Sequence, residues 1–347
     1  MAATLKDIAA IVGISEPAVS LVLNGRQYHR VSKAMRARIE EVARELDYRP
    51  NRQAQLLAGK RTNTVALLVN SLLNQFFAEY LSAVEVELRD ASFHTIPFET
   101  HSDPKRAEDI LGMVDQRICD AVIAIEYTTD PSLAAGRKPD FPLVTRSESL
   151  GERHDPATVN VAVWVEYEPA IRHLFMHFKR VGARRIGLLL DSRNDLTRPE
   201  TERSPRAVAY EKILTSLGLY SGGSQCQSLS QEAELADWAK ATEALLTREP
   251  EIDCVLVHNA LVAPAVLHQL AVMGRRVGRD IAVATYDDTV TTPWLVGGLT
   301  VVCEPIPEVS KALVEATLAI IKGDDVPERA PIEAKLIARA SSNLEAS

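Results

Sequence analysis

The chain has 347 residues, of which 46% are hydrophobic and 25% charged, and its net charge is −8 at pH 7. It contains no internal repeat, no low-complexity tract and no apolar run long enough to span a membrane. The four cysteines are widely spaced and form no CxxC pair, so packed, reduced thiols are expected rather than a disulfide framework.

The N-terminal segment TLKDIAAIVGISEPAVSLVLNG has the pattern of two short helices joined by a tight turn. Thr4 can cap the first helix, and Asp7 stands three residues later in a capping-box position. Gly13 suits the left-handed turn that ends this helix. Ser15 can cap the second helix, in whose first turn Pro17 is tolerated. The segment therefore predicts a helix-turn-helix.

A third helix follows from Ser32, with apolar residues at helical spacing that would close a small core. Any small three-helix bundle can show these periods, but the distribution of charge along the chain distinguishes the head from the rest. Residues 1–61 hold 11 basic and 6 acidic side chains, a net charge of +5, whereas the remainder carries −13. A basic head on an acidic body favours a phosphate-binding module on a regulator over a purely structural bundle.

In a helix-turn-helix the second helix enters the major groove with its N-terminal residues first. The residues expected on its outer side or at its leading end are Glu16, Pro17, Ala18, Ser20 and Leu21. The residues expected to contact phosphates or to position the DNA backbone are Thr4, Ser15, Ser20, Asn24, Arg26, His29, Arg30, Tyr48 and Asn51.

The head and the segment YRPNRQAQLLAGK that follows it resemble the lac repressor family of bacterial transcription regulators. The resemblance implies a hinge helix that forms on the operator, with Leu57 as a wedge in the minor groove and Ala54 allowing two hinges to approach closely. Ordinary packing of a linker helix is the alternative for Leu57. Departures from the family lie at Glu16, Pro17 and Leu21: leucine cannot make a bidentate contact to guanine, which leaves the operator sequence open.

The body alternates strand and helix patterns. VALLV is a continuous apolar run that suits a buried parallel strand, and strand-like segments FHTIPFE, DAVIAIE, FPLVTR, RIGLLLD, DCVLVHN and IAVATYD follow with helical patterns between them. This order predicts an α/β fold with parallel sheets. Nearly 290 residues are many for one sheet, so two subdomains are expected.

For these subdomains the resemblance implies a periplasmic-binding-protein-like arrangement of two Rossmann-like halves that the chain links three times, near residues 162, 291 and 324. The expected head is 1–49, the hinge and linker 50–61, and the effector-binding and dimerisation domain 62–347. Within this domain, subdomain N covers about 62–162 and 292–324, and subdomain C covers about 163–291 and 325–347.

A ligand is expected at the carboxyl ends of the strands, in the cleft between the subdomains. By matching to the family, the effector-binding residues are Phe76, Phe77, Ser147, Trp164, Arg206, Asn259 and Asp287. An arginine, an amide and a carboxylate in one cleft suit a polyol, a sugar derivative or a small polar acid. Packing in the core is the alternative for Phe77 and Trp164, and a solvated turn or helix cap for Asp287.

No phosphate loop, nucleophile elbow or metal motif is found, so neither enzyme activity, a cofactor nor a metal is expected. His173 and His177 are four apart but lack the glutamate of a zinc-protease motif, and a surface or interface position is expected. Met1 leads straight into the first helix, so a cytoplasmic, nucleoid-associated protein is expected.

The predicted function is a ligand-responsive transcription regulator, expected to be a repressor, that binds a pseudo-palindromic operator as a homodimer. Seven residues follow AKLIARA, too few for a heptad-repeat helix of the kind that forms tetramers, so a dimer is expected. A binding or sugar-processing protein with a structural N-terminal bundle is the alternative. Induction, corepression and activation all remain open.

Overall fold

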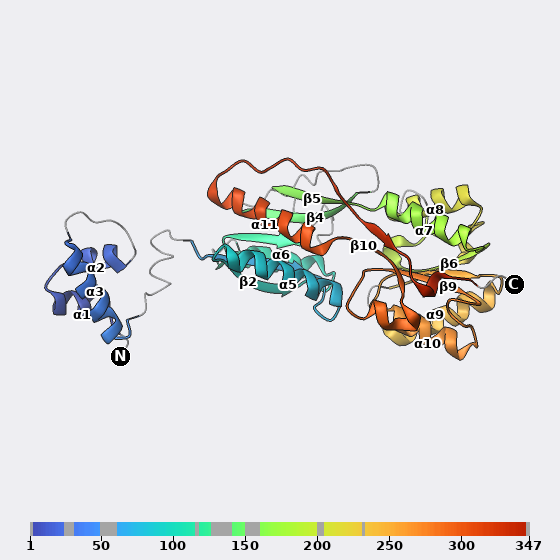
Figure 1. Ribbon diagram of the computed structural model, residues 1–347, viewed down its shortest axis with the longest axis horizontal. Coiled ribbons are helices and arrows are strands. Elements are labelled where there is room, and N and C mark those ends of the chain that lie inside the picture. The colour runs from blue at the N-terminus through green and yellow to red at the C-terminus, as the bar shows by residue number, and fades with distance from the viewer. Residues whose placement is uncertain are drawn as a thin grey trace. The chain divides into compact units, whose positions relative to one another are not determined.

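The computed structural model describes residues 3–23, 31–48, 61–114, 118–125, 141–149, 160–199, 205–230 and 233–344. The chain divides into two compact units, Met1–Arg61 and Thr62–Ser347. The first unit is helical, and the second contains two six-stranded sheets with their helices (Figure 1). The predicted fold class, a helical head with an α/β body of two sheets, is confirmed.

The head consists of α1 (Leu5–Val12), α2 (Glu16–Leu23) and α3 (Lys33–Glu45). Thr4 caps α1 as predicted: its hydroxyl accepts the backbone N–H of Asp7 at 3.3 Å, and the Asp7 carboxylate accepts the backbone N–H of Thr4 at 2.9 Å. Gly13 ends α1 with φ of 74°. The hydroxyl of Ser32 accepts from Met35 at the start of α3.

A small apolar core holds the three helices of the head together. Its fully buried members are Ile8, Val19, Ile39 and Val42. Ala18 was expected on the outer side of α2 but is buried, because residues four apart share a helix face and Ala18 therefore lies beside the buried Val22. The expectation of an outer position for Ala18 is therefore wrong, whereas its expected contact with DNA stays a prediction.

The first sheet of the second unit has the strand order β11-β5-β4-β3-β1-β2, and all its neighbouring pairs are parallel. Its strands are β1 (Thr64–Val69), β2 (His94–Glu99), β3 (Ala121–Ala124), β4 (Leu143–Ser149), β5 (Val161–Glu166) and β11 (Ile332–Glu333). Every residue of β1 is buried, as expected for a continuous apolar run inside a parallel sheet. The associated helices are α5 (Gln75–Asp90), α6 (Pro104–Met113) and α11 (Ile306–Lys322), and α11 packs against α5.

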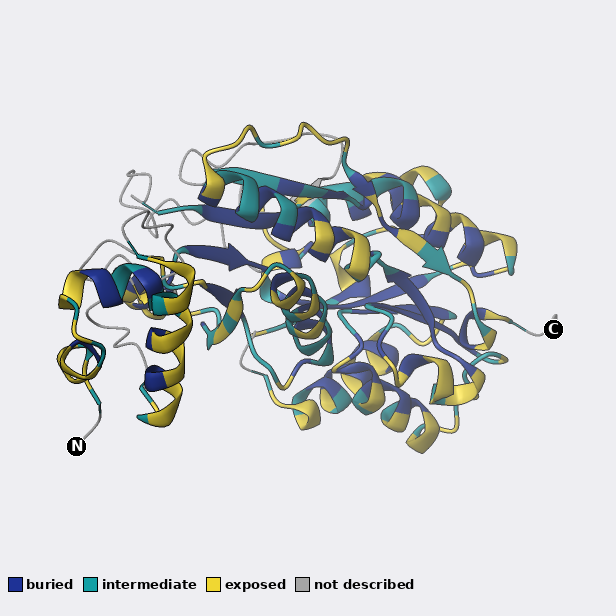
Figure 2. Ribbon diagram, turned by 60° about the vertical axis from the view of Figure 1, so that its left-hand side comes forward, coloured by how far each residue is buried: buried dark blue, intermediate teal, exposed yellow. Residues whose placement is uncertain are grey.

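The second sheet has the order β12-β10-β9-β8-β6-β7 and is parallel except for the pair of β10 and β12. Its strands are β6 (Ile186–Asp191), β7 (Cys226–Leu229), β8 (Cys254–Val257), β9 (Ala282–Tyr286), β10 (Thr300–Cys303) and β12 (Lys335–Ile337). Its helices are α7 (Glu168–Arg180), α8 (Pro205–Leu217), α9 (Leu235–Arg248) and α10 (Ala263–Val272). In Figure 2 the strands are mostly buried, while the helices expose one side.

The chain passes between the two sheets three times. It leaves the first sheet after Glu166, returns to it after Cys303, and runs from β11 to β12 across Ala334. The sequence placed these passages near 162, 291 and 324. The second differs most because β10 pairs with β9 and so belongs to the second sheet, and a strand of only four residues does not by itself show which sheet it joins.

Two further expectations concern cysteines and histidines. All four cysteines are free, and three of them are buried. His173 is exposed as expected, but His177 is buried, and its Nε2 lies 2.7 Å from the hydroxyl of Ser342. His177 was expected at the surface or at an interface; this is wrong because it is buried within the chain, on the apolar face of α7 beside Phe178. Among the described helices none is long and apolar enough to cross a membrane.

Candidate functional site

The leading end of α2 is the part of the head that a DNA groove could receive. Glu16 and Pro17 are exposed there, and Ser20 and Leu21 are half-buried one turn later. Ser15 precedes the helix and its backbone oxygen accepts from Val19 at 3.1 Å. These positions leave polar and apolar side chains, but no basic one, at the groove-facing end.

The other predicted DNA contacts fall into two groups. Thr4 is exposed and caps α1, and Tyr48 is half-buried against the core of the head. The remaining predicted contacts lie outside the described residues; they are Asn24, Arg26, His29, Arg30, Asn51, Ala54 and Leu57. Their assignment stays a prediction.

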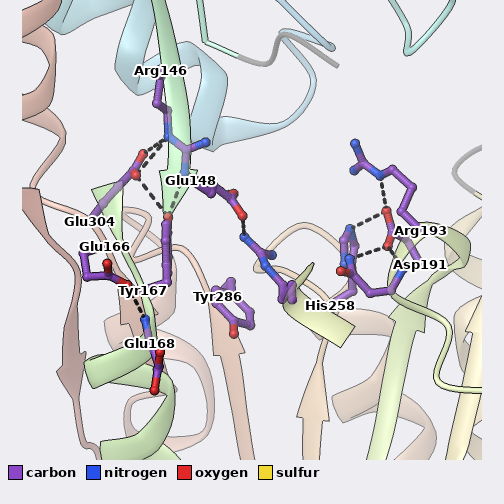
Figure 3. Close-up of polar contacts among 12 residues, drawn as sticks. Arg146, Glu148, Glu166, Tyr167, Glu168, Asp191, Arg193, His258, Tyr286 and Glu304 are labelled. Carbon is purple, nitrogen blue, oxygen red and sulfur yellow. Dashed lines mark hydrogen bonds and ion pairs between the residues drawn. The ribbon is translucent and has the colours of Figure 1, made fainter. Parts of the chain in front are cut away.

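A buried polar network lies in the second unit where its two sheets are joined. Arg146 on β4 donates from Nε to both carboxylate oxygens of Glu304, at 2.8 and 2.9 Å. Glu304 follows β10, so this ion pair links the two sheets. The Tyr167 hydroxyl after β5 also donates to Glu304, at 3.0 Å (Figure 3). The Tyr80 hydroxyl on α5 donates to the same carboxylate.

The ion pair of Arg146 and Glu304 is almost completely enclosed, with side chains 8% and 1% exposed. The Arg146 guanidinium also lies 5.6 Å from the ring centre of Phe76 and donates from Nη2 to the Tyr167 hydroxyl at 2.9 Å. A buried charge pair of this kind is tolerated only when its hydrogen-bonding capacity is filled, and here several partners fill it.

A second ion pair joins the sheets beside the first. Arg206, in the first turn of α8, donates to the Glu148 carboxylate on β4. The guanidinium lies over two aromatic rings, 4.8 Å from the centre of Tyr286 and 5.4 Å from that of Tyr167. Arg146 also reaches Glu148, with Nη2 at 3.3 Å. Glu148 therefore lies between two guanidinium groups.

The pKa values of two carboxyl groups follow from this arrangement. Burial raises the pKa of Glu148, but Arg206 and Arg146 outweigh it and hold that pKa at about 2. Burial, followed by the negative charge of Glu304, raises the pKa of Asp287 to about 7. One carboxyl group is therefore a fixed anion, while the other exchanges a proton near neutral pH.

A further polar group lies at the ends of β6 and β8. The Asp191 carboxylate, 2% exposed, accepts from Arg193 Nε at 2.7 Å and from Asn194 Nδ2 at 2.6 Å. His258 Nε2 lies 3.9 Å away (Figure 3). Its ring stacks on that of Trp238, with the ring centres 5.8 Å apart. Burial raises the pKa of Asp191, but His258 and Arg193 outweigh it and the pKa lies below its usual range.

The structure brings some of the predicted effector residues to this network. Arg206 and Phe76 contact it directly, and Asp287 follows β9 next to Tyr286 with its backbone in the left-handed region, φ 69°. Phe77 is buried in the main apolar core. Asn259 accepts the backbone N–H of Val262 at 3.2 Å.

The remaining predicted effector residues lie on adjacent strands. Ser147 on β4 pairs in register with Trp164 on β5, and both are half-buried. The Ser147 hydroxyl lies 3.3 Å from that of Thr145. No effector role is tested by these contacts, so the assignments stay predictions.

The sequence patterns did not point to five further residues of this network. These are Arg146, Glu148, Tyr167, Tyr286 and Glu304. The signal that could have found three of them is a charged residue inside or directly after a short apolar strand, as in FPLVTRSE and TVVCE. Such charges are rare in buried strands unless paired.

Two family models match the chain. "Bacterial regulatory proteins, lacI family" matches residues 4–51, and "Periplasmic binding protein-like domain" matches residues 175–342. The HTH-type transcriptional repressor PurR of Aliivibrio salmonicida (strain LFI1238) is 25% identical over 324 residues, which cover 92% of each chain.

Two solved structures are similar over their whole length. A complex of the transcriptional regulator CelR with cellobiose has a TM-score of 0.66 at 24% identity, covering 98% of this chain and 100% of that chain. A lac repressor dimer bound to operator and the anti-inducer ONPF has a TM-score of 0.80 at 21% identity, covering 99% and 100%. The described chain has the same order of helical head and two-sheet body. The chain therefore has a DNA-binding domain of the lacI family of bacterial regulatory proteins at residues 4–51 and a periplasmic binding protein-like domain in its body, and relatives that match nearly its whole length are transcription regulators.

Proposed function

We propose that the protein is a repressor that binds a pseudo-palindromic operator as a homodimer and is controlled by a small polar effector held between the two sheets of its body. The observation that carries this proposal is the pair of ionic links across those sheets, because a ligand that alters them changes how the two halves are held.

DNA binding is assigned to the head and to the segment 50–61, the proposed hinge. The net charge of +5 over residues 1–61 favours contact with phosphates, and α2 presents Glu16 and Pro17 at its leading end, with Leu21 half-buried one turn later. We assign Leu57 to a minor-groove wedge that kinks the operator. The lac repressor dimer that resembles this chain was solved on its operator, which supports the assignment.

A second copy of the chain is the proposed partner. Several large apolar side chains of the second unit are open to solvent in the single chain: Leu73 is 87%, Val290 67% and Trp294 84% exposed. Burial of these side chains against a second copy would remove their apolar surface from water, which favours association through the body. Two heads on one dimer then match the two half-sites of a pseudo-palindrome.

Effector control is assigned to the region around Arg206, Asp287 and Phe76, with Ser147, Trp164 and Asn259 as further candidate contacts. The regulator CelR, which resembles this chain, was solved with cellobiose. Effector binding would shift the halves of the body and so the spacing of the two hinges, and by thermodynamic linkage DNA would change effector affinity by the same factor. A regulator of this kind works at the chromosome, so we infer a cytoplasmic, nucleoid-associated protein.

The experiment is selection of genomic DNA fragments by the purified full-length protein, followed by sequencing of the bound fraction. The proposal predicts a short pseudo-palindrome in the enriched fragments. A bound fraction with no shared motif, at salt concentrations that remove nonspecific binding, would refute sequence-specific recognition by the head.

A further inference from the structure

The guanidinium of Arg206 is buried between two aromatic rings and is neutralised from the opposite sheet. Its side chain is only 14% exposed, and the ion pair that the structure gives it is with Glu148. Arg206 belongs to α8 beside the second sheet, whereas Glu148 belongs to β4 of the first. A buried guanidinium without an anion is strongly destabilising, so any rearrangement that removes Glu148 must bring another anion to Arg206.

Glu148 can leave Arg206 without becoming unpaired itself. Its side chain is 34% exposed, and it retains Arg146 Nη2 at 3.3 Å. Arg146 in turn keeps both contacts with Glu304. The separation of Glu148 from Arg206 therefore leaves one uncompensated charge, that of Arg206, and this charge is positive.

We propose that the Glu148 carboxylate occupies, in the effector-free protein, the position of an acid group of the effector, and that the effector is a small hydroxylated carboxylic acid whose carboxylate displaces Glu148 from Arg206. This inference rests on the proposed function and narrows the effector from polar molecules in general to anions. A neutral polyol cannot take the place of Glu148, because it brings no charge to the buried guanidinium.

Asp287 supports an acidic ligand rather than opposing it. No hydrogen bond or ion pair of its carboxyl group is found among the described residues, and it follows β9 directly after Tyr286, whose ring lies under Arg206. Because its pKa lies at about 7, a large fraction of Asp287 is protonated at neutral pH. A protonated carboxyl group donates a hydrogen bond to an anionic ligand and does not repel it.

The exchange also supplies a means of control. The ion pair of Arg206 and Glu148 joins the two sheets. An acid bound to Arg206 would take the place of Glu148 and so break this connection. The ligand thus removes one of the two ionic links between the halves of the body and leaves the link between Arg146 and Glu304. A differential contact of this kind is what a conformational response to a ligand requires.

The test uses the full-length protein and three pairs of probes that differ in one acid group: gluconate and glucitol, galacturonate and galactose, and glycerate and glycerol. Acetate serves as a minimal anion. Binding is measured by calorimetry and by the shift of the thermal midpoint, at constant chloride concentration and ionic strength. The variants are Glu148→Gln, the double variant Glu148→Gln with Arg206→Gln, and a charge-matched control, Glu85→Gln, which breaks an exposed pair with Arg89 on α5.

The proposal predicts that the acids bind Glu148→Gln at least about tenfold more tightly than the wild type, since the internal competitor is gone; tenfold corresponds to about 1.4 kcal/mol. Glu85→Gln should bind as the wild type does, and the double variant should lose the gain. If no probe binds the wild type, the acetate-dependent rise of the midpoint in Glu148→Gln, absent from the double variant, still supports the exchange.

Two results would overturn the inference: neutral probes binding the wild type as tightly as their acid partners, or acids binding Glu148→Gln no better than the wild type. Far-ultraviolet circular dichroism shows whether each variant is folded. The selection of genomic DNA fragments is carried out with the same protein preparations, and its result is judged independently of ligand binding. Loss of a DNA motif with the anion exchange intact would refute the regulator proposal and leave the exchange, whereas the reverse outcome would refute only the acidic effector.

Discussion

Replacing Arg146 by methionine should be one of the most destabilising single changes in the body. The substitution leaves the Glu304 carboxylate, 1% exposed, without its guanidinium partner, while methionine roughly fills the volume. Breaking a buried pair by removing one partner costs about 3–5 kcal/mol. The exposed pair of Arg89 and Glu85, with side chains 61% and 43% exposed, provides the contrast: Arg89→Met should cost at most about 0.5 kcal/mol.

A double variant separates the free energy lost with the ion pair from the free-energy cost of burying the charge that remains. Arg146→Met combined with Glu304→Gln removes the buried charge, yet the glutamine oxygen can still accept from Tyr80 and Tyr167. We expect the double variant to recover at least about 1.5 kcal/mol relative to Arg146→Met, because an uncharged group costs less to bury than an unpaired ion.

The assay is urea unfolding of the full-length protein followed by far-ultraviolet circular dichroism, at one protomer concentration because association contributes to stability. The unfolding midpoints and slopes are compared for the wild type, Arg146→Met, Arg89→Met and the double variant. A loss below about 1 kcal/mol for Arg146→Met, or a double variant less stable than Arg146→Met, would refute the reasoning.

Three further changes test other parts of the molecule. Leu57→Ala should weaken specific operator binding far more than binding to unrelated DNA in an anisotropy titration, and equal losses would contradict the wedge assignment. Thr4→Ala removes the hydroxyl that accepts from the Asp7 backbone at 3.3 Å and should cost about 1 kcal/mol in the unfolding of the head, while an unchanged unfolding transition would contradict the cap. Asp287 has a folded pKa of about 7 against a reference of 3.8, so the folded state holds the proton more tightly and wild-type stability should fall as pH rises between these values. Asp287→Asn should therefore gain stability relative to wild type from about pH 4 to about pH 7, and a constant difference in the unfolding midpoints would exclude the raised pKa.

The parts of the fold that the sequence predicted are those with strong local signals. Thr4, Gly13 and Ser32 mark helix ends through hydrogen bonds that form within a few residues, and each has its predicted role. The run VALLV becomes a fully buried central strand because an apolar stretch without alternation fits only where both faces are covered.

Other features depend on contacts between distant segments, which local patterns do not encode. β10 joins the second sheet through its pairing with β9, and His177 is buried by its packing with Ser342, 165 residues away. In α2 the expectation failed for Ala18 because eight residues form little more than two turns, too few to fix which face is turned inward.

The candidate effector site also combines a residue that could be identified from the sequence with partners that depend on distant contacts. Arg206 was identified by matching, but its partner Glu148 lies 58 residues earlier in the chain and on the other sheet. The ion pair of Arg206 and Glu148 forms because of the way in which the two halves are joined after Glu166 and Cys303. No residue spacing within β4 or α8 predicts it. Glu304 and Tyr80, 224 residues apart, meet for the same reason.

The most direct test of the account is to measure the affinity of the full-length protein for its selected operator with and without a dialysable small-molecule extract of its source organism. The account predicts that the extract changes the operator affinity by at least about fivefold, in either direction, and that the operator changes the affinity of the active component by the same factor. An operator affinity that stays constant while a component of the extract binds between the two sheets would contradict the coupling of effector and DNA.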